Sequence, residues 1–414
     1  MTDFTYKDGK LCAEDIPLFE IAKQYNTPCY VYSKNAICSR YLEFDSAFAS
    51  ERHLLCYAVK ANSNISILNI LAKLGSGFDV VSGGELYRVI NAGGDPKKIV
   101  FSGVGKREEE MKLALSKDIK CFNVESKSEL YKLNEIAKSV GKSAPVSLRV
   151  NPDVDAKTHP YISTGLKENK FGIAFGLAKS LYQDAAAMEN INLIGIDCHI
   201  GSQISELSPF ENALKRLLDL IDELKKDGIQ LQHVDIGGGL GITYEDEKPP
   251  TPMEYVRVMT NIIKKYNLEI IIEPGRSIVG NAGILLTKVE YLNLTPYRNF
   301  AIVDAAMNDL IRPSLYGSWH DIKNAKESLE DDELLYDVVG PVCETADFIG
   351  KQRCLKLKEN DLLAVFSAGA YGFSMSSNYN SRPRPNEILV DGSKSHEIRK
   401  RESLDDLING ESLV

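Results

Sequence analysis

Several residues that could do chemistry stand at the ends of short apolar stretches of this chain. Lys60 ends one such stretch, His199 ends another, and Glu273 ends a third. A lysine in such a position is poorly solvated, and desolvation lowers the pKa of an amine and makes it a nucleophile toward an aldehyde. The alternative is a lysine that reaches solvent at a strand end, and taken alone that alternative is the better one.

Two glycine-rich turns favour the reactive interpretation. Gly237-Gly238-Gly239 follows one apolar stretch, and Glu273-Pro274-Gly275-Arg276 follows the next. Bare glycine backbone lets N–H groups approach phosphate oxygens, although such turns by themselves often mean only a tight bend. A reactive lysine and a phosphate cradle together imply a phosphorylated aldehyde, and pyridoxal 5′-phosphate (PLP) fits that description.

Glu273 and His199 gain roles beside such a cofactor. A carboxylate at Glu273 would hold the pyridine nitrogen protonated, which makes the ring an electron sink. A neutral imidazole at His199 could lie flat on the ring. The alternatives are a capping or ion-paired glutamate and a hydrogen-bonded structural histidine, both of which are common at strand ends.

Eight short apolar stretches must position these residues. Segments of helical period separate them, as in the run Leu214, Leu217, Leu218, Ile221 and Leu224. Eight strands that alternate with helices close a parallel (β/α)8 barrel of TIM type, whose active site lies at the C-terminal strand ends, here including Asp79. The predicted strands are Leu54–Lys60, Phe78–Ser82, Ile99–Val104, Cys121–Glu125, Val146–Asn151, Leu193–His199, His233–Ile236 and Glu269–Glu273.

A second, β-rich domain is predicted from the rest of the chain, because strand-like stretches there follow one another without long helices between them. Tyr30–Tyr32 alternates like a strand and belongs with them, and Ser33 caps a helix that runs from Lys34 to about Glu51. We expect the barrel over 34–280 and a sandwich- or barrel-like domain formed by 1–33 and 281–414. Its later strands are Ile284–Leu294, Asn299–Val303, Leu334–Val339, Leu362–Phe366 and Glu387–Val390.

Composition narrows the function classes. The 414 residues carry a net charge of −9 with scattered Lys and Arg, which argues against a nucleic-acid surface. No apolar run reaches the roughly 18–20 residues that span a bilayer, and residues 1–7 lack signal-peptide features, so a cytoplasmic protein is expected. The eight cysteines show no CxxC pair and no zinc spacing, which predicts free thiols and no bound metal.

The motifs as a set resemble a known enzyme group. The segments around Lys60, His199, Gly237 and Glu273 are similar to the PLP decarboxylases built on an alanine-racemase-like barrel (fold type III). Within that group the resemblance is to the diaminopimelate decarboxylases, over essentially the whole length. The discriminating segments are His159–Gly165, Asn308–Gly317, Gly340–Asp347 and Ala370–Gly372, with Cys343-Glu344 where ornithine- and arginine-type enzymes carry Cys-Asp.

The resemblance implies an activity and a set of site residues. The reaction would be decarboxylation of meso-2,6-diaminopimelate to L-lysine and CO₂, the last step of lysine biosynthesis, in a homodimer whose Cys343 loop enters the partner's site. The implied catalytic residues are Lys60, His199, Glu273 and the proton donor Cys343. Further cofactor contacts would be Asp79, Ser202, Gly238, Gly239, Gly275, Arg276 and Tyr371, and substrate contacts Arg276, Arg312, Tyr316, Glu344 and Tyr371.

Two alternatives stay open at this point. A related PLP decarboxylase could act on ornithine, arginine or a carboxynorspermidine-type substrate, although two arginines and Glu344 favour a substrate with a distal amino-acid end. A non-catalytic PLP carrier would consist of a single barrel and would lack the β-rich domain. The apolar neighbours Leu310, Ile311 and Leu315 predict a buried, ion-pairing Arg312.

Overall fold

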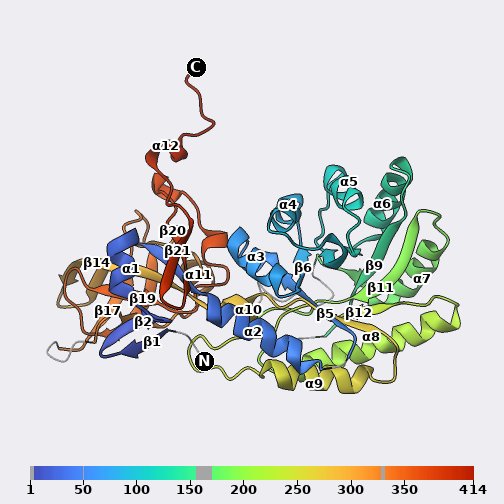
Figure 1. Ribbon diagram of the computed structural model, residues 1–414, viewed down its shortest axis with the longest axis horizontal. Helices are drawn as coiled ribbons and strands as arrows, with labels where there is room; N and C mark the ends of the chain where they lie inside the picture. The colour runs from blue at the N-terminus through green and yellow to red at the C-terminus, as the bar shows by residue number, and fades with distance from the viewer. Residues whose placement is uncertain (1–3, 50, 155–169, 328–331) are drawn as a thin grey trace. The chain divides into compact units, whose positions relative to one another are not determined.

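The computed structural model describes residues 4–49, 51–154, 170–327 and 332–414. The chain divides into two compact units (Figure 1). One unit comprises Arg40–Ile242 and Lys248–Ser277, and the other comprises Met1–Ser39, Thr243–Glu247 and Ile278–Val414. The segment His159–Gly165, which contributes to the resemblance, lies outside the described residues.

The first of these units is a closed parallel barrel. Its strands pair in the order β5-β6-β7-β8-β9-β11-β12-β13, and β13 pairs back with β5. The short strand β10 (Ile173–Ala174) adds to β9 outside the closed ring. The predicted (β/α)8 barrel is therefore confirmed. Its strands are β5 (His53–Ala58), β6 (Gly77–Val80), β7 (Ile99–Phe101), β8 (Cys121–Val124), β9 (Ala144–Asn151), β11 (Ile191–Asp197), β12 (His233–Asp235) and β13 (Glu269–Ile272).

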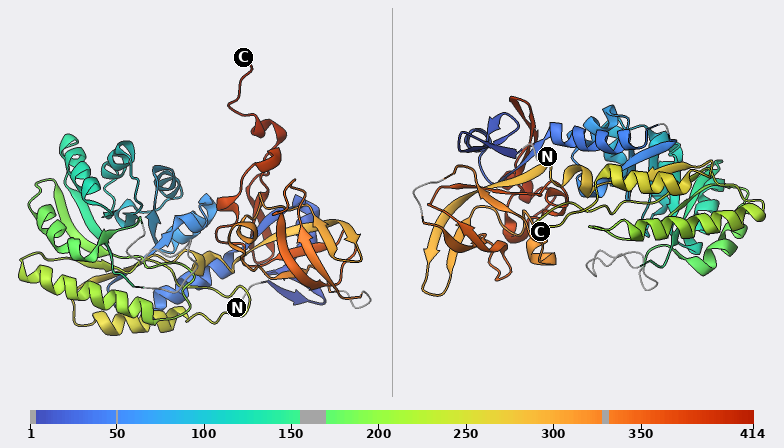
Figure 2. Two further views of the ribbon diagram at one scale, coloured as in Figure 1. Left: turned by 180° about the vertical axis from the view of Figure 1, so that it is seen from behind. Right: turned by 90° about the horizontal axis from the view of Figure 1, so that it is seen from below.

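Helices cover the outside of the barrel, as the views in Figures 1 and 2 show. They form where apolar side chains recur at helical spacing, as on α8, whose leucine-rich face is buried. Polar caps fix several helix starts: Ser126 accepts the N–H of Glu129, and Thr251 forms a capping box with Glu254. The helices are α3 (Ile65–Lys73), α4 (Gly83–Asn91), α5 (Glu108–Ser116), α6 (Lys127–Ser139), α7 (Phe175–Ala186), α8 (Ser208–Lys226) and α9 (Pro252–Ile263).

Three predicted strand ends are corrected by the structure. Lys60 lies in a 3₁₀ turn, η1 (Val59–Ala61), rather than in the first barrel strand. His199 and Glu273 follow the ends of β11 and β13 instead of closing them, whereas Asp79 lies inside β6. The ladder ends before Lys60, His199 and Glu273 because the chain turns there, and a run of apolar residues does not reveal where that turn begins.

The second unit is built on a mixed sheet around the long strand β14 (Gly283–Leu294). The strand order is β18-β17-β15-β14-β4-β20-β21, and β19 (Leu362–Val365) also pairs with β14. The predicted Tyr30–Tyr32 strand is found as β4 (Cys29–Ser33), which pairs with β14 and β20. The β-rich domain that combines N-terminal and C-terminal segments is therefore confirmed. Its other strands are β15 (Asn299–Val303), β16 (Ile322–Asn324), β17 (Leu334–Val339), β18 (Phe348–Leu355), β20 (Asn386–Asp391) and β21 (Lys394–Arg399).

Several elements of this unit were not anticipated. A three-stranded sheet of β1 (Phe4–Lys7), β2 (Lys10–Ala13) and β3 (Ile16–Pro17) precedes helix α1 (Leu18–Tyr25). The polar tail forms strand β21 and the short helix α12 (Leu404–Leu407). Helix α2 (Lys34–Ala47) begins where expected, since the Ser33 hydroxyl accepts the N–H of Ala36 at 3.0 Å, but it ends before Glu51.

Candidate active site

Lys60 is paired with a buried carboxylate at the C-terminal end of the barrel. Its Nζ lies 2.7 Å from Oδ2 of Asp79, whose side chain is fully buried while that of Lys60 remains 35% exposed. The pairing follows from the sheet register, because Ala58 of β5 stands opposite Asp79 of β6. Lys60 lies in the turn η1, just after β5, and its amine contacts Asp79.

Glu273 is a buried carboxyl in the same layer of the barrel. It is 4% exposed, and its Oε1 has no hydrogen-bond partner among the described residues. Burial, together with the negative charges of Asp235, Asp79 and Asp197, raises the pKa of Glu273 well above its ordinary value, while Lys60 opposes that shift. A buried, unpaired carboxyl oxygen is costly, so this site calls for a hydrogen-bond donor.

His199 is held in a neutral form. The backbone N–H of Gly238 donates to its Nδ1 at 3.1 Å, which requires that this nitrogen be unprotonated. Burial and the positive charges of Arg149 and Lys60 lower the pKa of His199 well below its usual range. The neutral imidazole expected from the sequence is therefore consistent with its surroundings.

The glycine turn packs tightly on these two residues. Gly237 and Gly239 adopt left-handed backbone angles, with φ of +71° and +111°. A Cβ on Gly238 would lie 2.2 Å from the carbonyl oxygen of Glu273, and one on Gly237 would lie 2.7 Å from Nδ1 of His199. Only glycine therefore lets this turn approach the strand ends so closely.

Arg276 and Ser202 form a second polar group at the same end of the barrel. Nη2 of Arg276 donates to the Ser202 hydroxyl at 2.9 Å, and Arg276 is 6% exposed. Gly275 lies beside the turn that carries Lys60, because a Cβ there would come within 3.1 Å of the Cβ atoms of Ala58 and Ala61. These contacts place three turns side by side at the same end of the barrel: the glycine turn, the turn with Arg276 and the turn with Lys60.

The barrel also holds a charged layer that the motifs did not indicate. Nη1 of Arg149 contacts Glu125 at 2.9 Å, and its Nε lies 3.9 Å from Asp197. Asp197 and Asp235 are both buried and lie near Glu273, with carboxyl oxygens of the three residues within 4.8 Å of one another. The available signal was a charged residue inside an otherwise apolar strand, as Arg149 is in β9 (Ala144–Asn151).

Arg312 occupies a buried position in the second unit. It begins helix α11 (Arg312–Tyr316), is 7% exposed and donates to the Ser318 hydroxyl at 3.2 Å. Its guanidinium lies 5.6 Å from the Tyr316 ring centre and 5.2 Å from that of Tyr244. Burial of Arg312 is as expected, but its neighbour Leu315 is 47% exposed, because α11 turns that side chain outward.

Cys343 and Glu344 lie on an exposed loop of the second unit. The buried carboxylate of Asp347 accepts the N–H of Met307 and of Val342, each at 2.7 Å, and so fixes the base of the loop. Asp347 therefore fixes the backbone at the base of the loop, while the side chains of Cys343 and Glu344 are exposed to solvent.

Tyr371 has a left-handed backbone, with φ of +55°, in a turn packed on Tyr30. A Cβ on Gly372 would lie 2.8 Å from the Tyr30 ring, and the Tyr30 hydroxyl donates to the carbonyl of Asp309 at 2.6 Å. Tyr30 thus links the Tyr371 turn to the segment that leads into Arg312. This strained backbone is held by its surroundings, as functional turns often are.

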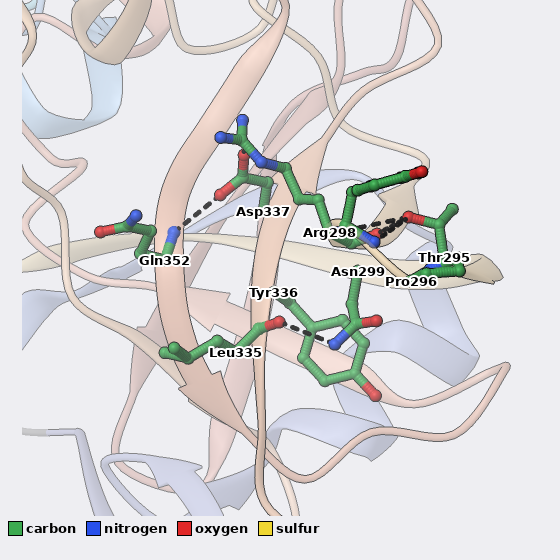
Figure 3. Close-up of a pocket in the computed structure, with 9 residues that line it drawn as sticks. Thr295, Pro296, Arg298, Asn299, Leu335, Tyr336, Asp337 and Gln352 are labelled. Atoms are coloured by element: carbon green, nitrogen blue, oxygen red, sulfur yellow. Dashed lines mark hydrogen bonds and ion pairs between the residues drawn. The ribbon is translucent and has the colours of Figure 1, made fainter.

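A cavity of about 280 Å³ in the second unit contains none of the predicted site residues (Figure 3). Its polar groups are already engaged with one another: the Gln352 N–H donates to Asp337 at 2.8 Å, and Asn299 donates to the Leu335 carbonyl at 3.2 Å. Figure 3 also shows Arg298 beside Asp337, with which it forms an ion pair at 2.9 Å. This cavity lacks a reactive group and is not a candidate site.

The barrel residues fit PLP. The unpaired Oε1 of Glu273 suits a protonated ring nitrogen, and a lysine stands in the same layer for the aldehyde. The close-packed glycine turn, with Arg276 and Ser202, supplies backbone and side-chain donors of the kind that bind phosphate. The chemistry of these donors therefore agrees with a phosphorylated pyridine aldehyde.

Comparison with known proteins decides the family. Residues 34–280 match the model of the pyridoxal-dependent decarboxylase pyridoxal-binding domain. Diaminopimelate decarboxylases of Vibrio cholerae and Pseudomonas aeruginosa are 57% and 56% identical to the chain, with full coverage of both sequences. The chain belongs to the diaminopimelate decarboxylase family.

Solved structures of this family have the same fold. Diaminopimelate decarboxylase of M. jannaschii in complex with L-lysine is 41% identical over 99% of this chain and 98% of its own, with a TM-score of 0.95. The Helicobacter pylori enzyme complexed with L-lysine is 44% identical over 95% of this chain and 98% of its own, with a TM-score of 0.92. The chain is thus a PLP-dependent carboxy-lyase of lysine biosynthesis that takes an amino-acid substrate. Among the described residues, no helix is long and apolar enough to cross a bilayer.

Proposed function

We propose that this chain removes CO₂ from meso-2,6-diaminopimelate and releases L-lysine at a site in which Lys60 and Glu273 hold PLP. The observation that carries the assignment is the buried Oε1 of Glu273, which lacks a hydrogen-bond partner in the described part of the chain. A protonated ring nitrogen is the donor this oxygen needs. The positive charge of Lys60 also lowers the pKa of Glu273, which supports the placement of both residues in one site.

In this proposal the barrel residues bind and orient the cofactor. When bound, PLP supplies an electron-poor ring that accepts the electron pair left as CO₂ departs from Cα. Lys60 binds the aldehyde carbon, and Asp79 orients its amine from 2.7 Å. Glu273 would keep the proton on the ring nitrogen, and the neutral His199 would face the ring. Phosphate contacts come from Ser202, Gly238, Gly239, Gly275, Arg276 and Tyr371.

The substrate contacts distinguish the two ends of the substrate. Diaminopimelate carries a second amino-acid end, which the enzyme must hold without reacting. Arg276 and Arg312 can grip its distal carboxylate in forked geometry, and Glu344 can take its distal ammonium. The Tyr316 ring centre lies 5.6 Å from the Arg312 guanidinium and so belongs to the same group of side chains. A substrate such as ornithine lacks the distal carboxylate and would make neither of these two contacts.

Cys343 is the proposed proton donor to Cα, within a homodimer that shares its active sites. The thiol lies on an outward-facing loop whose base is fixed by Asp347, so it is presented away from its own unit. A thiol can donate its S–H proton to the carbon that carries the electron pair. In the proposed dimer, Cys343 and Glu344 of one chain complete the site of the other.

We propose that the barrel domain, residues 34–280, binds PLP. The β-rich domain, formed by residues 1–33 and 281–414, then supplies substrate contacts and the dimer interface. We also place the enzyme in the cytoplasm. All eight cysteines are free, which suits a reducing compartment.

A decarboxylation assay tests the proposed function. The purified chain with PLP should release CO₂ from meso-diaminopimelate and form L-lysine, and Lys60→Ala should abolish that release. The substrate panel should include ornithine, arginine and carboxynorspermidine, all of which we expect to be turned over far more slowly. Equal or faster turnover of any of these three would overturn the proposed substrate.

A further inference from the structure

Asp235, the last residue of β12, connects the glycine turn to Glu273 through the backbone. Its Oδ1 accepts the N–H of Gly237 at 2.9 Å, and the carbonyl of Gly237 in turn accepts the N–H of Glu273 at 2.8 Å. Asp235 is fully buried, so both hydrogen bonds lie away from water. The position of the Glu273 backbone therefore depends on Asp235.

The second oxygen of Asp235 lies in an unusual setting. Oδ2 of Asp235 and Oε1 of Glu273 are both buried and lack hydrogen-bond partners among the described residues. Oxygens of the two carboxyls, with one of Asp197, lie within 4.8 Å of one another. Ionised carboxylates can only accept hydrogen bonds, so neighbouring carboxyls in a dry interior are stabilised when they share a proton.

Asp197 also has a buried oxygen without a partner among the described residues, but of the three carboxyls it is the one that lies beside a guanidinium, which favours the Asp235–Glu273 pair as the place for that proton. Arg149 (β9) is engaged by Glu125 at 2.9 Å and lies 3.9 Å from Asp197. Lys60 (η1) is engaged by Asp79 (β6) at 2.7 Å. Other groups near the pair are the neutral His199 and the buried thiols of Cys56, Cys121 and Cys198, none of which carries a positive charge.

We propose that Asp235 is a positioning residue for Glu273: it fixes the backbone that carries the glutamate and shares one proton with its carboxyl until PLP binds. This inference rests on the proposed role of Glu273 as partner of the ring nitrogen. Asp235 itself touches neither substrate nor cofactor in this account.

The titration of the pair agrees with that arrangement. Burial, and next the charge of Asp235, raise the pKa of Glu273 well above its ordinary value. Burial also raises the pKa of Asp235, to about 7, while the hydrogen bond from the Gly237 N–H opposes the increase. Both shifts are in the direction that favours one retained proton on the pair.

PLP binding must then displace this proton. A ring nitrogen that arrives protonated requires an ionised Glu273, so the shared proton leaves for solvent. A ring nitrogen that arrives bare receives the proton from Glu273 directly. In both cases the Glu273 carboxyl gives up one proton, and the charge on the pair changes only when PLP enters.

Two measurements on the full-length protein follow the proton without using activity. The infrared difference spectrum between apoenzyme and PLP-loaded enzyme should show loss of the carbonyl band of a protonated carboxyl. Calorimetry of PLP binding in buffers of different ionisation enthalpy measures the number of protons released. Wild type should release about one more proton per site than Asp235→Asn does. The first measurement uses the unmodified chain and so does not depend on any variant folding.

The variants separate the two functions of Asp235. Asp235→Asn keeps an oxygen for the Gly237 N–H and removes the shared proton, so the infrared band should vanish from its apoenzyme. Glu273→Gln should also remove the band. Asp197→Asn is the matched control, since Asp197 belongs to the same cluster but faces Arg149, and it should retain the band.

The outcomes are distinguishable. An infrared band that persists in Asp235→Asn but vanishes in Glu273→Gln would overturn the shared proton and leave the proposed function intact. Equal loss of the band in Asp197→Asn and Asp235→Asn would also overturn it, because Asp235 would then have no special part. Glu273→Gln with unchanged PLP affinity and kcat would instead refute the proposed role of Glu273. A stoichiometric divalent cation in the apoenzyme would show that a metal, not a proton, joins the carboxyls.

Discussion

Glu273 and Arg312 are both buried and ionisable, yet they should affect the reaction differently. Glu273 faces developing charge in the ring, so its effect belongs to the transition state, whereas Arg312 binds an unreactive end of the substrate in every state. Glu273→Ala should lower kcat by roughly 10²–10³-fold, and Arg312→Ala should raise KM by roughly 10–100-fold with a smaller change in kcat.

Steady-state kinetics with meso-diaminopimelate checks this pair of variants. Glu273→Asp, which keeps the charge on a shorter side chain, serves as the matched control and should recover part of kcat. An intact kcat with a raised KM in Glu273→Ala would contradict the assigned role of that carboxyl.

His233 gives a pH prediction that concerns stability alone. Burial, and next the charge of Lys120, lower its pKa to about 3, below the ordinary value of 6.5. The folded state thus binds this proton less readily than the unfolded chain, so the free energy of unfolding falls as pH drops below 6.5. Between pH 6.5 and 5 the loss from this residue is about 2 kcal/mol.

Denaturant unfolding of wild type and His233→Gln at several pH values checks this effect. The variant lacks the titrating imidazole, so the stability difference between the two proteins should shift in favour of the variant as pH falls from 6.5 to 5. Parallel pH profiles would mean that His233 titrates normally in the folded state.

The eight barrel strands and their alternation with helices followed from the sequence because apolar runs and helical spacing are local signals. The strand ends at the site could not be predicted. Lys60, His199 and Glu273 come after the last hydrogen-bonded residue of their strands, although the apolar runs continue up to them. Strand β21 was missed because its residues are mostly polar and none of them is buried. It is held by pairing with β20 rather than by its own hydrophobicity.

The same limit applies to the candidate site. Lys60, Glu273 and the glycine turn carry recognisable motifs. The approach of Asp235 to Glu273 and of Arg149 to Asp197 instead joins strands that are distant in sequence. Only the closed barrel brings such residues together, so their proximity cannot be read from spacing along the chain.

The glycine turn after β12 offers a test at the level of one element. Gly238→Ala would place a Cβ 2.2 Å from the Glu273 carbonyl, and backbone there cannot move without shifting the site. We expect a loss of about 1–3 kcal/mol in unfolding free energy and weaker PLP binding. Gly105→Ala is the control, since nothing lies within 4 Å of its Cβ. Thermal unfolding and PLP titration measure the two effects. Equal stability and equal PLP affinity in the two variants would contradict the packing argument.

Considered as a whole molecule, the chain carries its predicted functional residues in two separate units. Lys60 belongs to the barrel unit, and Cys343 belongs to the β-rich unit. We propose that the two residues meet across a dimer. Mixing inactive Lys60→Ala with inactive Cys343→Ala should, after random subunit exchange, restore about a quarter of wild-type activity, because half of the dimers are mixed and each has one intact site. No recovery after proven exchange would place both residues in the site of their own chain.

The central claim is that Lys60 holds PLP at the barrel mouth beside Asp79 and Glu273. Borohydride reduction of the PLP-loaded enzyme followed by peptide mapping tests it most directly, because reduction makes the link between lysine and cofactor permanent. The account predicts a single modified peptide that contains Lys60, with the modification absent from Lys60→Ala. A cofactor adduct on any other lysine of the wild-type chain would contradict the site assignment.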